Sequence, residues 1–386
     1  MKKTISILGA SGSVGTQALD VARHSGYKVD FISVGSNIKF AEDTVRELDI
    51  PLVAVADERA AGELKLSLSD TDTNVLGGAS GIIEGIERSR SETAINSIIG
   101  AAGLLPSLAV IDSGKRLALA NKETLVIGGS LVMERARARG CEILPVDSEH
   151  SAIFQSLKSG KPSEIKRILL TASGGPFFGK SREELSCVTV ADALAHPTWS
   201  MGKKITVDSA TMMNKGFEII EAAHLFGVGS DKIQVVVHRE SILHSAVEYI
   251  DNTVIGELSV PDMRMCVKYA VDYPERCAGS SAQLDLFSVG KLTFLPPDER
   301  AFQLLSLAKR SLSDGGGMGA VINASDEVAV AAFLEGRLSF LGISEAVEEA
   351  YERMLFATEA KTVDELVNID RMARDITSSI ISKKEI

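Results

Sequence analysis

Hydrophobic and polar residues follow two alternating patterns along the first 147 residues of the chain. Short β-rich runs recur at Thr4–Gly9, Tyr27–Val34, Leu52–Ala56, Ala94–Ile99, Arg116–Ala120 and Glu142–Val146. The stretches between them have helical periodicity, for example Ser13–Ser25, Phe40–Leu48, Arg59–Leu68 and Glu123–Arg139. Strands and helices that alternate in this way form right-handed βαβ units, so residues 1–147 are predicted to be an α/β domain with a doubly wound parallel sheet.

The pattern changes after residue 147. Residues 148–273 contain strand-like runs at Ile165–Thr171, Lys204–Val207 and Ile233–Val237, and a predicted hairpin of Ala246–Ile250 and Thr253–Val260 that turns at Asp251-Asn252. We expect a central α+β domain here. Residues 274–298 have little periodicity and are predicted to be a linker. Residues 299–386 have apolar residues at helical spacing, which predicts a C-terminal helical bundle.

Composition and charge narrow the class of protein. Of the 386 residues, 45% are hydrophobic and 24% charged, which excludes a disordered or fibrous chain. The formal net charge of −11 argues against nucleic acid or an anionic membrane as the main partner. The four cysteines include no Cys-x-x-Cys pair, which is typical of a reducing cytoplasm. The uncharged stretch Thr93–Ile111 contains Asn96 and Pro106, so we expect a buried segment of a soluble, cytoplasmic protein rather than a membrane span.

A glycine-rich segment follows the first predicted strand directly and opens the first predicted helix. It reads Gly9-Ala-Ser-Gly12-Ser-Val-Gly15. Glycines at this spacing allow a tight turn and a close approach of the backbone to a pyrophosphate, whose charge is stabilised at a helix N-terminus. The segment predicts a Rossmann-like dinucleotide site, and a purely structural glycine turn is the alternative.

The end of the second predicted strand indicates which dinucleotide binds. NAD enzymes usually place a carboxylate there to bind the ribose 2′-hydroxyl. This chain instead has Val34-Gly35-Ser36-Asn37, with Asp30 inside the strand and Lys39 close behind. The missing carboxylate and the nearby base favour NADP over NAD.

Two carboxylates follow the last predicted strand of the parallel sheet, in the segment Asp147-Ser148-Glu149. Ligands bind at the carboxyl ends of strands in such folds. Residues two apart in an extended chain face the same side, so both carboxylates can bind one cation, and oxygen ligands favour Mg²⁺ or Mn²⁺. The alternative is that Asp147 or Ser148 only caps the helix that follows.

Further polar groups gather downstream. Ser173-Gly174-Gly175 follows one predicted strand, and Ser209 and the segment Asn214–Glu218 follow another. Hydroxyls, an amide and a lysine are the groups that bind a phosphate monoester. Between them lies His196-Pro-Thr-Trp199-Ser-Met-Gly202, which contains the only tryptophan. Trp199 is either a core residue or part of a lid that closes over a ligand.

Together these segments resemble the 1-deoxy-D-xylulose 5-phosphate reductoisomerase family along nearly the whole chain. The matching blocks are, besides the glycine loop, Ala118–Glu123, Val146–His150, His196–Gly202, Asp208–Glu218, Pro261–Arg264 and Asn323–Phe333. The resemblance implies an oxidoreductase that rearranges 1-deoxy-D-xylulose 5-phosphate and reduces it to 2-C-methyl-D-erythritol 4-phosphate in non-mevalonate isoprenoid biosynthesis. It also implies NADPH, a divalent cation (Mg²⁺, Mn²⁺ or Co²⁺) and a V-shaped homodimer whose middle domain carries catalysis and dimerisation.

The resemblance also implies roles for individual residues. It implies that the metal ligands are Asp147, Glu149 and Glu218, and that Lys122 points at the reacting carbons. Contacts with the substrate are implied for Lys122, Ser148, Glu149, Ser173, His196, Trp199, Ser209, Asn214, Lys215 and Glu218. Among these, Ser173, Ser209, Asn214 and Lys215 would bind the phosphate, and Trp199 would lie on a lid. The NADPH site comprises Gly9, Ser11, Gly12, Ser13, Val14, Gly35, Ser36, Asn37, Asn121, Glu123 and Gly202.

Some positions depart from the family pattern. Ser36 stands where Lys or Arg usually meets the 2′-phosphate, so we expect a smaller preference for NADPH over NADH. Lys39 is the candidate to replace the missing base. Arg239-Glu240 replaces the usual Pro-Gln near His244. The sequence leaves open whether the rearrangement is a retro-aldol and aldol sequence, which we favour, or a direct shift. The alternatives are another NADP-dependent oxidoreductase of the semialdehyde or homoserine dehydrogenase type, and a regulator that binds the dinucleotide without chemistry.

Overall fold

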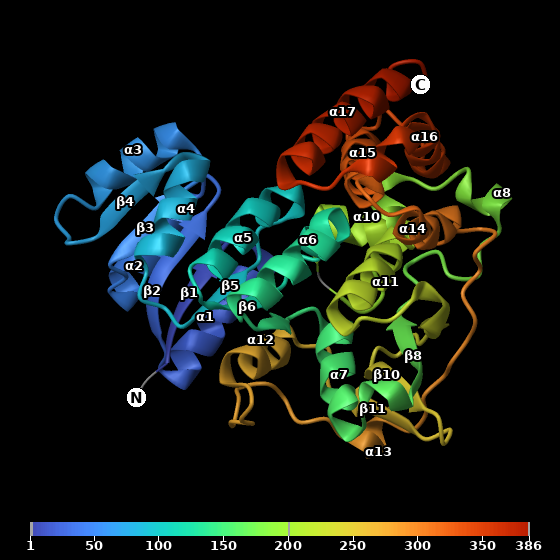
Figure 1. Cartoon of the computed structure of the whole chain (residues 1–386), viewed down its shortest axis with the longest axis horizontal. Helices are drawn as coiled ribbons and strands as arrows, with labels where there is room; N and C mark the ends of the chain where they lie inside the picture. The colour runs from blue at the N-terminus through green and yellow to red at the C-terminus, as the bar shows by residue number, and fades with distance from the viewer. Residues whose placement is uncertain (1–2, 200, 385–386) are drawn as a thin grey trace. The chain divides into compact units, whose positions relative to one another are not determined.

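A computed structural model describes residues 3–199 and 201–384 of the chain, which form two compact units. The first unit comprises residues up to Asn121, Val132–Ser151 and Asp262–Ala282, and the second comprises Lys122–Leu131, Ala152–Pro261 and the chain from Gln283 onward. Figure 1 labels the helices and strands of both. The chain passes from one unit to the other within two helices, α6 (Glu123–Arg139) and α7 (Ser148–Ser156).

The first unit is built on a seven-stranded sheet in the order β4-β3-β2-β1-β5-β6-β7, with every neighbouring pair parallel (Figure 1). Its strands are β1 (Thr4–Leu8), β2 (Lys28–Val34), β3 (Leu52–Val55), β4 (Asn74–Gly77), β5 (Thr93–Asn96), β6 (Arg116–Leu119) and β7 (Ile143–Pro145). Its helices are α1 (Ser13–Ser25), α2 (Ile38–Leu48), α3 (Glu58–Ser67), α4 (Gly78–Arg88), α5 (Leu104–Asp112) and α12 (Met263–Asp272). The predicted doubly wound α/β fold is confirmed, because the strand order reverses at β1.

One strand of this sheet has no counterpart in the sequence prediction. β4 is short, lies at the edge of the sheet, and has no fully buried residue. An edge strand that is exposed on one side has only a weak hydrophobic signal, so neither the apolar run nor the alternation that marks the other strands is present.

The second unit contains a four-stranded sheet in the order β11-β10-β8-β9. Its strands are β8 (Ile165–Ala172), β9 (Ile233–Val237), β10 (Leu243–Tyr249) and β11 (Val254–Leu258). β8 pairs with β9 in parallel and with β10 antiparallel, and β10 and β11 form the predicted hairpin. Asn252 has a φ of 67° in its turn, a conformation that asparagine adopts more readily than most residues.

The predicted strand at Lys204–Val207 is wrong, because this segment belongs to helix α10 (Lys203–Thr211). The β-branched residues of the segment favour a strand locally. Gly202 is the N-cap residue of α10, and Lys204 forms an ion pair with Asp208 one turn later. Burial of Thr206, Val207 and Ala210 then favours the helix, so tertiary packing overrides the local preference.

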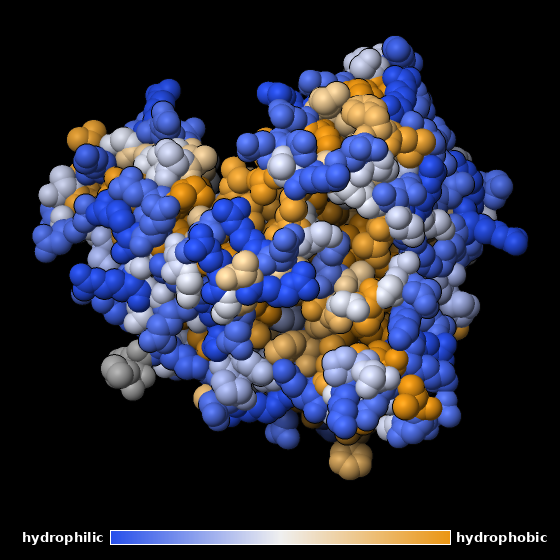
Figure 2. All heavy atoms as spheres, viewed as in Figure 1, coloured by the Kyte–Doolittle hydropathy of each residue, from blue (hydrophilic) through white to orange (hydrophobic). Residues whose placement is uncertain are grey.

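Helices make up the rest of the second unit. They are α8 (Arg182–Leu185), α9 (Val190–Leu194), α11 (Met213–Phe226), α13 (Leu286–Val289), α14 (Gln303–Asp314), α15 (Met318–Leu334), α16 (Phe340–Arg353) and α17 (Val363–Ile381). α15 packs against α16 and α17 and is buried along most of its length, which confirms the predicted C-terminal helical region (Figure 1). The surface around the charged helix α8 is strongly hydrophilic (Figure 2). In the described part of the chain, no helix has the length and apolar character needed to cross a membrane.

Candidate active site

The glycine loop has the geometry that a dinucleotide site requires. Gly9 has a φ of 78°, and a Cβ there would lie 2.8 Å from the carbonyl oxygen of Ser97. A Cβ on Gly15 would lie 2.2 Å from the Gly9 carbonyl oxygen, so α1 and the loop approach each other too closely for any side chain. α1 begins at Ser13 with Gly12 as its N-cap residue and no side-chain cap. Its first N–H groups are therefore not occupied by a capping side chain and are available to an anionic group.

The carboxyl end of β2 lies at the same edge of the parallel sheet. Gly35, Ser36 and Asn37 are exposed there, and the Asn37 side chain accepts a hydrogen bond from the Phe40 backbone at the start of α2. Lys39 is exposed and pairs with Asp43 at 2.7 Å. A cation already paired with a carboxylate attracts a phosphate less than a free one, so Lys39 is a weak substitute for a base at Ser36.

Asp147, Ser148 and Glu149 follow β7 at this same edge, where α7 begins. Ser148 donates a hydrogen bond to the Glu149 carboxylate, and the fully buried His150 places Nδ1 3.6 Å from the Asp147 carboxylate. The two carboxylates thus stand at a helix start and also at the carboxyl end of a strand. This placement is consistent with both interpretations of the sequence, in which these residues either cap the helix or bind a ligand.

A buried polar cluster surrounds Glu218 in the second unit. Glu218 is 1% exposed and lies on α11. Lys122 donates to Asn214 at 2.8 Å and to Glu218 at 3.1 Å, and Asn214 and Lys215 also donate to the Glu218 carboxylate. Four residues that the sequence analysis assigned to catalysis, metal or phosphate are therefore in direct contact. A buried carboxylate with this many donors is held in one orientation.

Ser173 and Ser209, the two predicted phosphate-binding serines, come from neighbouring segments. Ser173 follows β8, Ser209 lies in the last turn of α10, and a Cβ on Gly175 would lie 2.6 Å from the Ser209 carbonyl oxygen. Met212, with a φ of 63°, joins α10 directly to α11, which carries Asn214 and Lys215. The fold thus places the predicted phosphate-binding residues of this unit on one loop and one helix-turn-helix segment.

His196 binds the Ser173 hydroxyl in a defined protonation form. Its Nδ1 accepts hydrogen bonds from the backbone N–H groups of Thr198 and Trp199, at 3.2 and 2.9 Å. The proton of a neutral imidazole must then be on Nε2, which lies 3.0 Å from Ser173 Oγ and donates to it. Burial, and secondarily the positive charge of Arg239, lower the pKa of His196 and favour this neutral form.

Residues 195–199 and 201–202, the described part of the segment that carries Trp199, have no regular secondary structure. Trp199 is half-buried, and its ring centroid lies 6.2 Å from that of His244 at an angle of 66°. A tryptophan in the core would be more fully enclosed, so its placement favours the lid interpretation, which stays a prediction. Ser200 lies outside the described residues.

Arg239 is a site residue whose role the sequence analysis did not identify. Its guanidinium donates to the carbonyl oxygens of Ser173 and Gly175 at 3.1 and 2.7 Å. The sequence analysis noted that Arg239-Glu240 departs from the family pattern. It did not identify the partners of Arg239, because Ser173 and Gly175 are 66 and 64 positions away along the chain.

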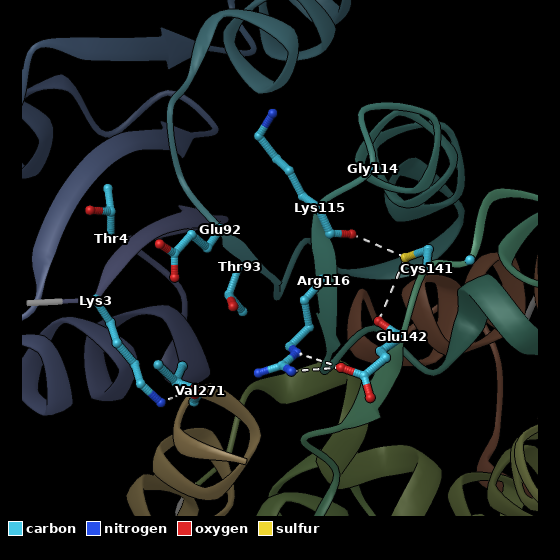
Figure 3. A pocket seen from close by; sticks show the side chains of 11 residues that line it. Lys3, Thr4, Glu92, Thr93, Gly114, Lys115, Arg116, Cys141, Glu142 and Val271 are labelled. Atoms are coloured by element: carbon cyan, nitrogen blue, oxygen red, sulfur yellow. Dashed lines mark hydrogen bonds and ion pairs between the residues drawn. The ribbon is translucent and has the colours of Figure 1, made fainter. Parts of the chain in front are cut away.

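A separate cavity of about 290 Å³ lies at the opposite edge of the parallel sheet, where the strands begin (Figure 3). Two of its cations are already paired, since Arg116 binds Glu142 at 2.6 Å and Lys3 binds Asp272 at 3.1 Å. Cys141 donates to the Lys115 carbonyl oxygen, and burial raises the pKa of its thiol, which lowers its reactivity. None of the residues that line this cavity belongs to the predicted site, and Cys141, its one thiol, is not activated.

Comparison with known proteins gives a consistent result. Models of the 1-deoxy-D-xylulose 5-phosphate reductoisomerase family match residues 5–129, 143–226 and 258–376. The chain is 47% identical over 382 residues to the 1-deoxy-D-xylulose 5-phosphate reductoisomerase of Halalkalibacterium halodurans, covering 98% of this chain and 100% of that protein. It is also 47% identical over 383 residues to the enzyme of Geobacillus kaustophilus, covering 98% and 100%.

Solved structures agree with this. The reductoisomerase of Zymomonas mobilis in complex with NADPH has a TM-score of 0.92 and 36% identity, covering 99% of both chains. A DOX-P reductoisomerase in complex with NADPH, fosmidomycin and magnesium has a TM-score of 0.93 and 36% identity, covering 98% of both chains. The resemblance predicted from the motifs is confirmed, and the semialdehyde or homoserine dehydrogenase alternative is not favoured. The chain belongs to the 1-deoxy-D-xylulose 5-phosphate reductoisomerase family.

Proposed function

We propose that this chain carries out its family's reaction with the residues described above. The reaction is the rearrangement of 1-deoxy-D-xylulose 5-phosphate and its reduction by NADPH to 2-C-methyl-D-erythritol 4-phosphate, with a divalent cation as cofactor. The observation that carries the residue assignment is the buried cluster in which Lys122, Asn214 and Lys215 all bind Glu218. Groups implicated separately in metal binding, phosphate binding and catalysis occur there together.

Asp147, Glu149 and Glu218 are proposed to hold the cation. They offer carboxylate oxygens only, the donors that Mg²⁺ and Mn²⁺ favour, and a relative binds magnesium together with NADPH. A bound divalent cation polarises a ketone and stabilises the negative charge that develops on substrate oxygens. Ser148, through its bond to Glu149, orients one of these carboxylates.

Ser173, Ser209, Asn214 and Lys215 are proposed to bind the substrate phosphate, with His196 fixing the Ser173 hydroxyl. Because His196 donates to Ser173 Oγ, the proton of that hydroxyl is left to donate to a phosphate oxygen. Lys122 presents a buried ammonium that is proposed to face the reacting carbons and stabilise charge there. Phosphate contacts remote from the reacting carbons supply binding energy that closes the segment carrying Trp199.

The glycine loop, the ends of β2 and β6 and the start of α10 are proposed to bind NADPH. The proposed residues are Gly9, Ser11, Gly12, Ser13, Val14, Gly35, Ser36, Asn37, Asn121, Glu123 and Gly202. We also propose the domain boundaries at residues 147, 273 and 298 on the basis of the sequence pattern, and the cytoplasmic location on the basis of the few cysteines. The homodimer is proposed because the family resemblance implies it.

The test is oxidation of NADPH by the purified protein with 1-deoxy-D-xylulose 5-phosphate, followed by absorbance, with Mg²⁺ or Mn²⁺ and again with a chelator. We expect oxidation that the chelator abolishes and added metal restores. A folded protein that binds NADPH but does not oxidise it with this substrate would contradict the proposal.

A further inference from the structure

Arg239 holds the loop that carries Ser173. The loop has two consecutive glycines in the left-handed region, Gly174 with a φ of 78° and Gly175 with a φ of 64°. It leaves β8 at this point, so its carbonyl groups have no strand partners. The two carbonyls on either side of Gly174, those of Ser173 and Gly175, both accept hydrogen bonds from the Arg239 guanidinium. The bonds span the bend and hold it in one conformation.

The guanidinium is itself held in place by packing. Its Cζ lies 5.5 Å from the centroid of the Phe178 ring, a residue just beyond the same loop. A guanidinium that lies over an aromatic face while donating to two carbonyls has little rotational freedom. The Arg239 side chain is therefore held in one conformation, unlike a mobile side chain at the surface.

The positive charge of Arg239 is not neutralised. The carboxylate of the neighbouring Glu240 does not pair with Arg239. It accepts a hydrogen bond from the Thr293 hydroxyl at 2.7 Å and lies beside the buried His238. Within the described ranges 3–199 and 201–384, Arg239 has no ion pair, and its partners are carbonyl groups. A full positive charge thus lies beside Ser173, where an anion would be stabilised.

We propose that Arg239 is a positioning residue for the substrate phosphate: it holds the Ser173–Gly175 loop in the conformation that presents the Ser173 hydroxyl, and it adds uncompensated positive charge beside that hydroxyl. This inference rests on the proposed function, because it assigns Ser173 to the phosphate. It goes beyond that function, because Arg239 belongs to none of the matching motifs.

The test compares Arg239→Gln and Arg239→Lys with wild type in steady-state kinetics. Arg371→Gln is the matched control, because Arg371 is an exposed arginine on α17 whose guanidinium donates to Asn368 of its own helix. In Arg239→Gln we expect the KM for 1-deoxy-D-xylulose 5-phosphate to rise about tenfold or more, because two charge-assisted bonds and a charge are lost. We expect kcat to fall by a smaller factor than the KM rises, since phosphate contacts also help to close the segment that carries Trp199, and the KM for NADPH to change by no more than about threefold.

Inorganic phosphate provides a second readout. Its competitive inhibition constant is expected to rise in parallel with the substrate KM in Arg239→Gln, and by about threefold in Arg239→Lys, which keeps the charge but not the paired donors. If Arg239→Gln does not fold, the inhibition constant of inorganic phosphate is measured with Arg239→Lys instead. Unchanged KM and inhibition constant in the folded variants would overturn the inference, as would an equal loss in kcat and in NADPH affinity. Failure of the proposed function would instead appear as absence of turnover in wild type.

Discussion

A buried ionic cluster in the second unit offers a quantitative test of its packing. Lys204 on α10 lies between two carboxylates, 2.6 Å from Asp208 of the same helix and 2.8 Å from Asp326 of α15. Asp208 is 3% exposed and Asp326 is fully buried. One ammonium thus compensates two carboxylates, and Lys204→Met removes the only cation that an ion pair links to them in the described residues.

The expected cost follows from the charges left behind. Removing one partner of a buried ion pair costs about 3–5 kcal/mol, because the remaining charge is left without compensation. The Lys204 side chain is 21% exposed, so water partly screens the cluster and the lower end, about 3 kcal/mol, applies. For a unit of this size, about 2–4 °C of melting temperature is lost per kcal/mol, which gives a decrease of about 6–12 °C.

The assay is thermal unfolding of Lys204→Met beside Lys203→Met, which removes an exposed lysine from the adjacent position of the same helix. Burial and the nearby Asp326 raise the pKa of Asp208 well above its ordinary value, whereas Lys204 lowers it. A carboxyl group with a raised folded-state pKa binds its proton more tightly in the folded state, so its contribution to stability falls as the pH rises. The deficit of Lys204→Met is therefore expected to be larger at about pH 8 than at about pH 5. Equal melting temperatures for the two variants, or a deficit that grows on acidification, would refute this reasoning.

Three further predictions concern the active site. Glu218→Gln should nearly abolish turnover while NADPH affinity, measured by fluorescence titration, is retained; loss of affinity instead would place Glu218 outside the proposed metal site. Trp199→Ala should raise the substrate KM with little change in melting temperature, and a large fall in melting temperature would show that Trp199 is a core residue. With Ser36 exposed and Lys39 paired with Asp43, the ratio of kcat/KM for NADPH over NADH should be below about a thousandfold, or roughly 4 kcal/mol; a higher ratio would contradict it.

The parts of the fold that were predicted correctly are those with strong local signals. The buried strands of the parallel sheet are continuous apolar runs, and the glycine loop needs glycine because a Cβ on Gly9 or Gly15 would clash with backbone. The errors occur where the local signal was weak or misleading. β4 is too exposed to have an apolar run, and Lys204–Val207 has the β-branched residues of a strand but is helical because of its packing.

The candidate site divides along the same line. Ser173, His196 and Glu218 belong to motifs of contiguous residues, so the sequence alone pointed to them. Arg239 acts on Ser173 across 66 positions, and nothing in the segment around Arg239 indicates which carbonyl groups it binds. Lys204 and Asp326 form a pair that is likewise local in space but remote in sequence. Contacts between a motif and residues remote from it in the sequence depend on how the chain packs. They form only when β8, β9 and α15 have reached their positions in the fold. Substitutions at such positions therefore test the packing of the site more directly than substitutions in the motifs themselves.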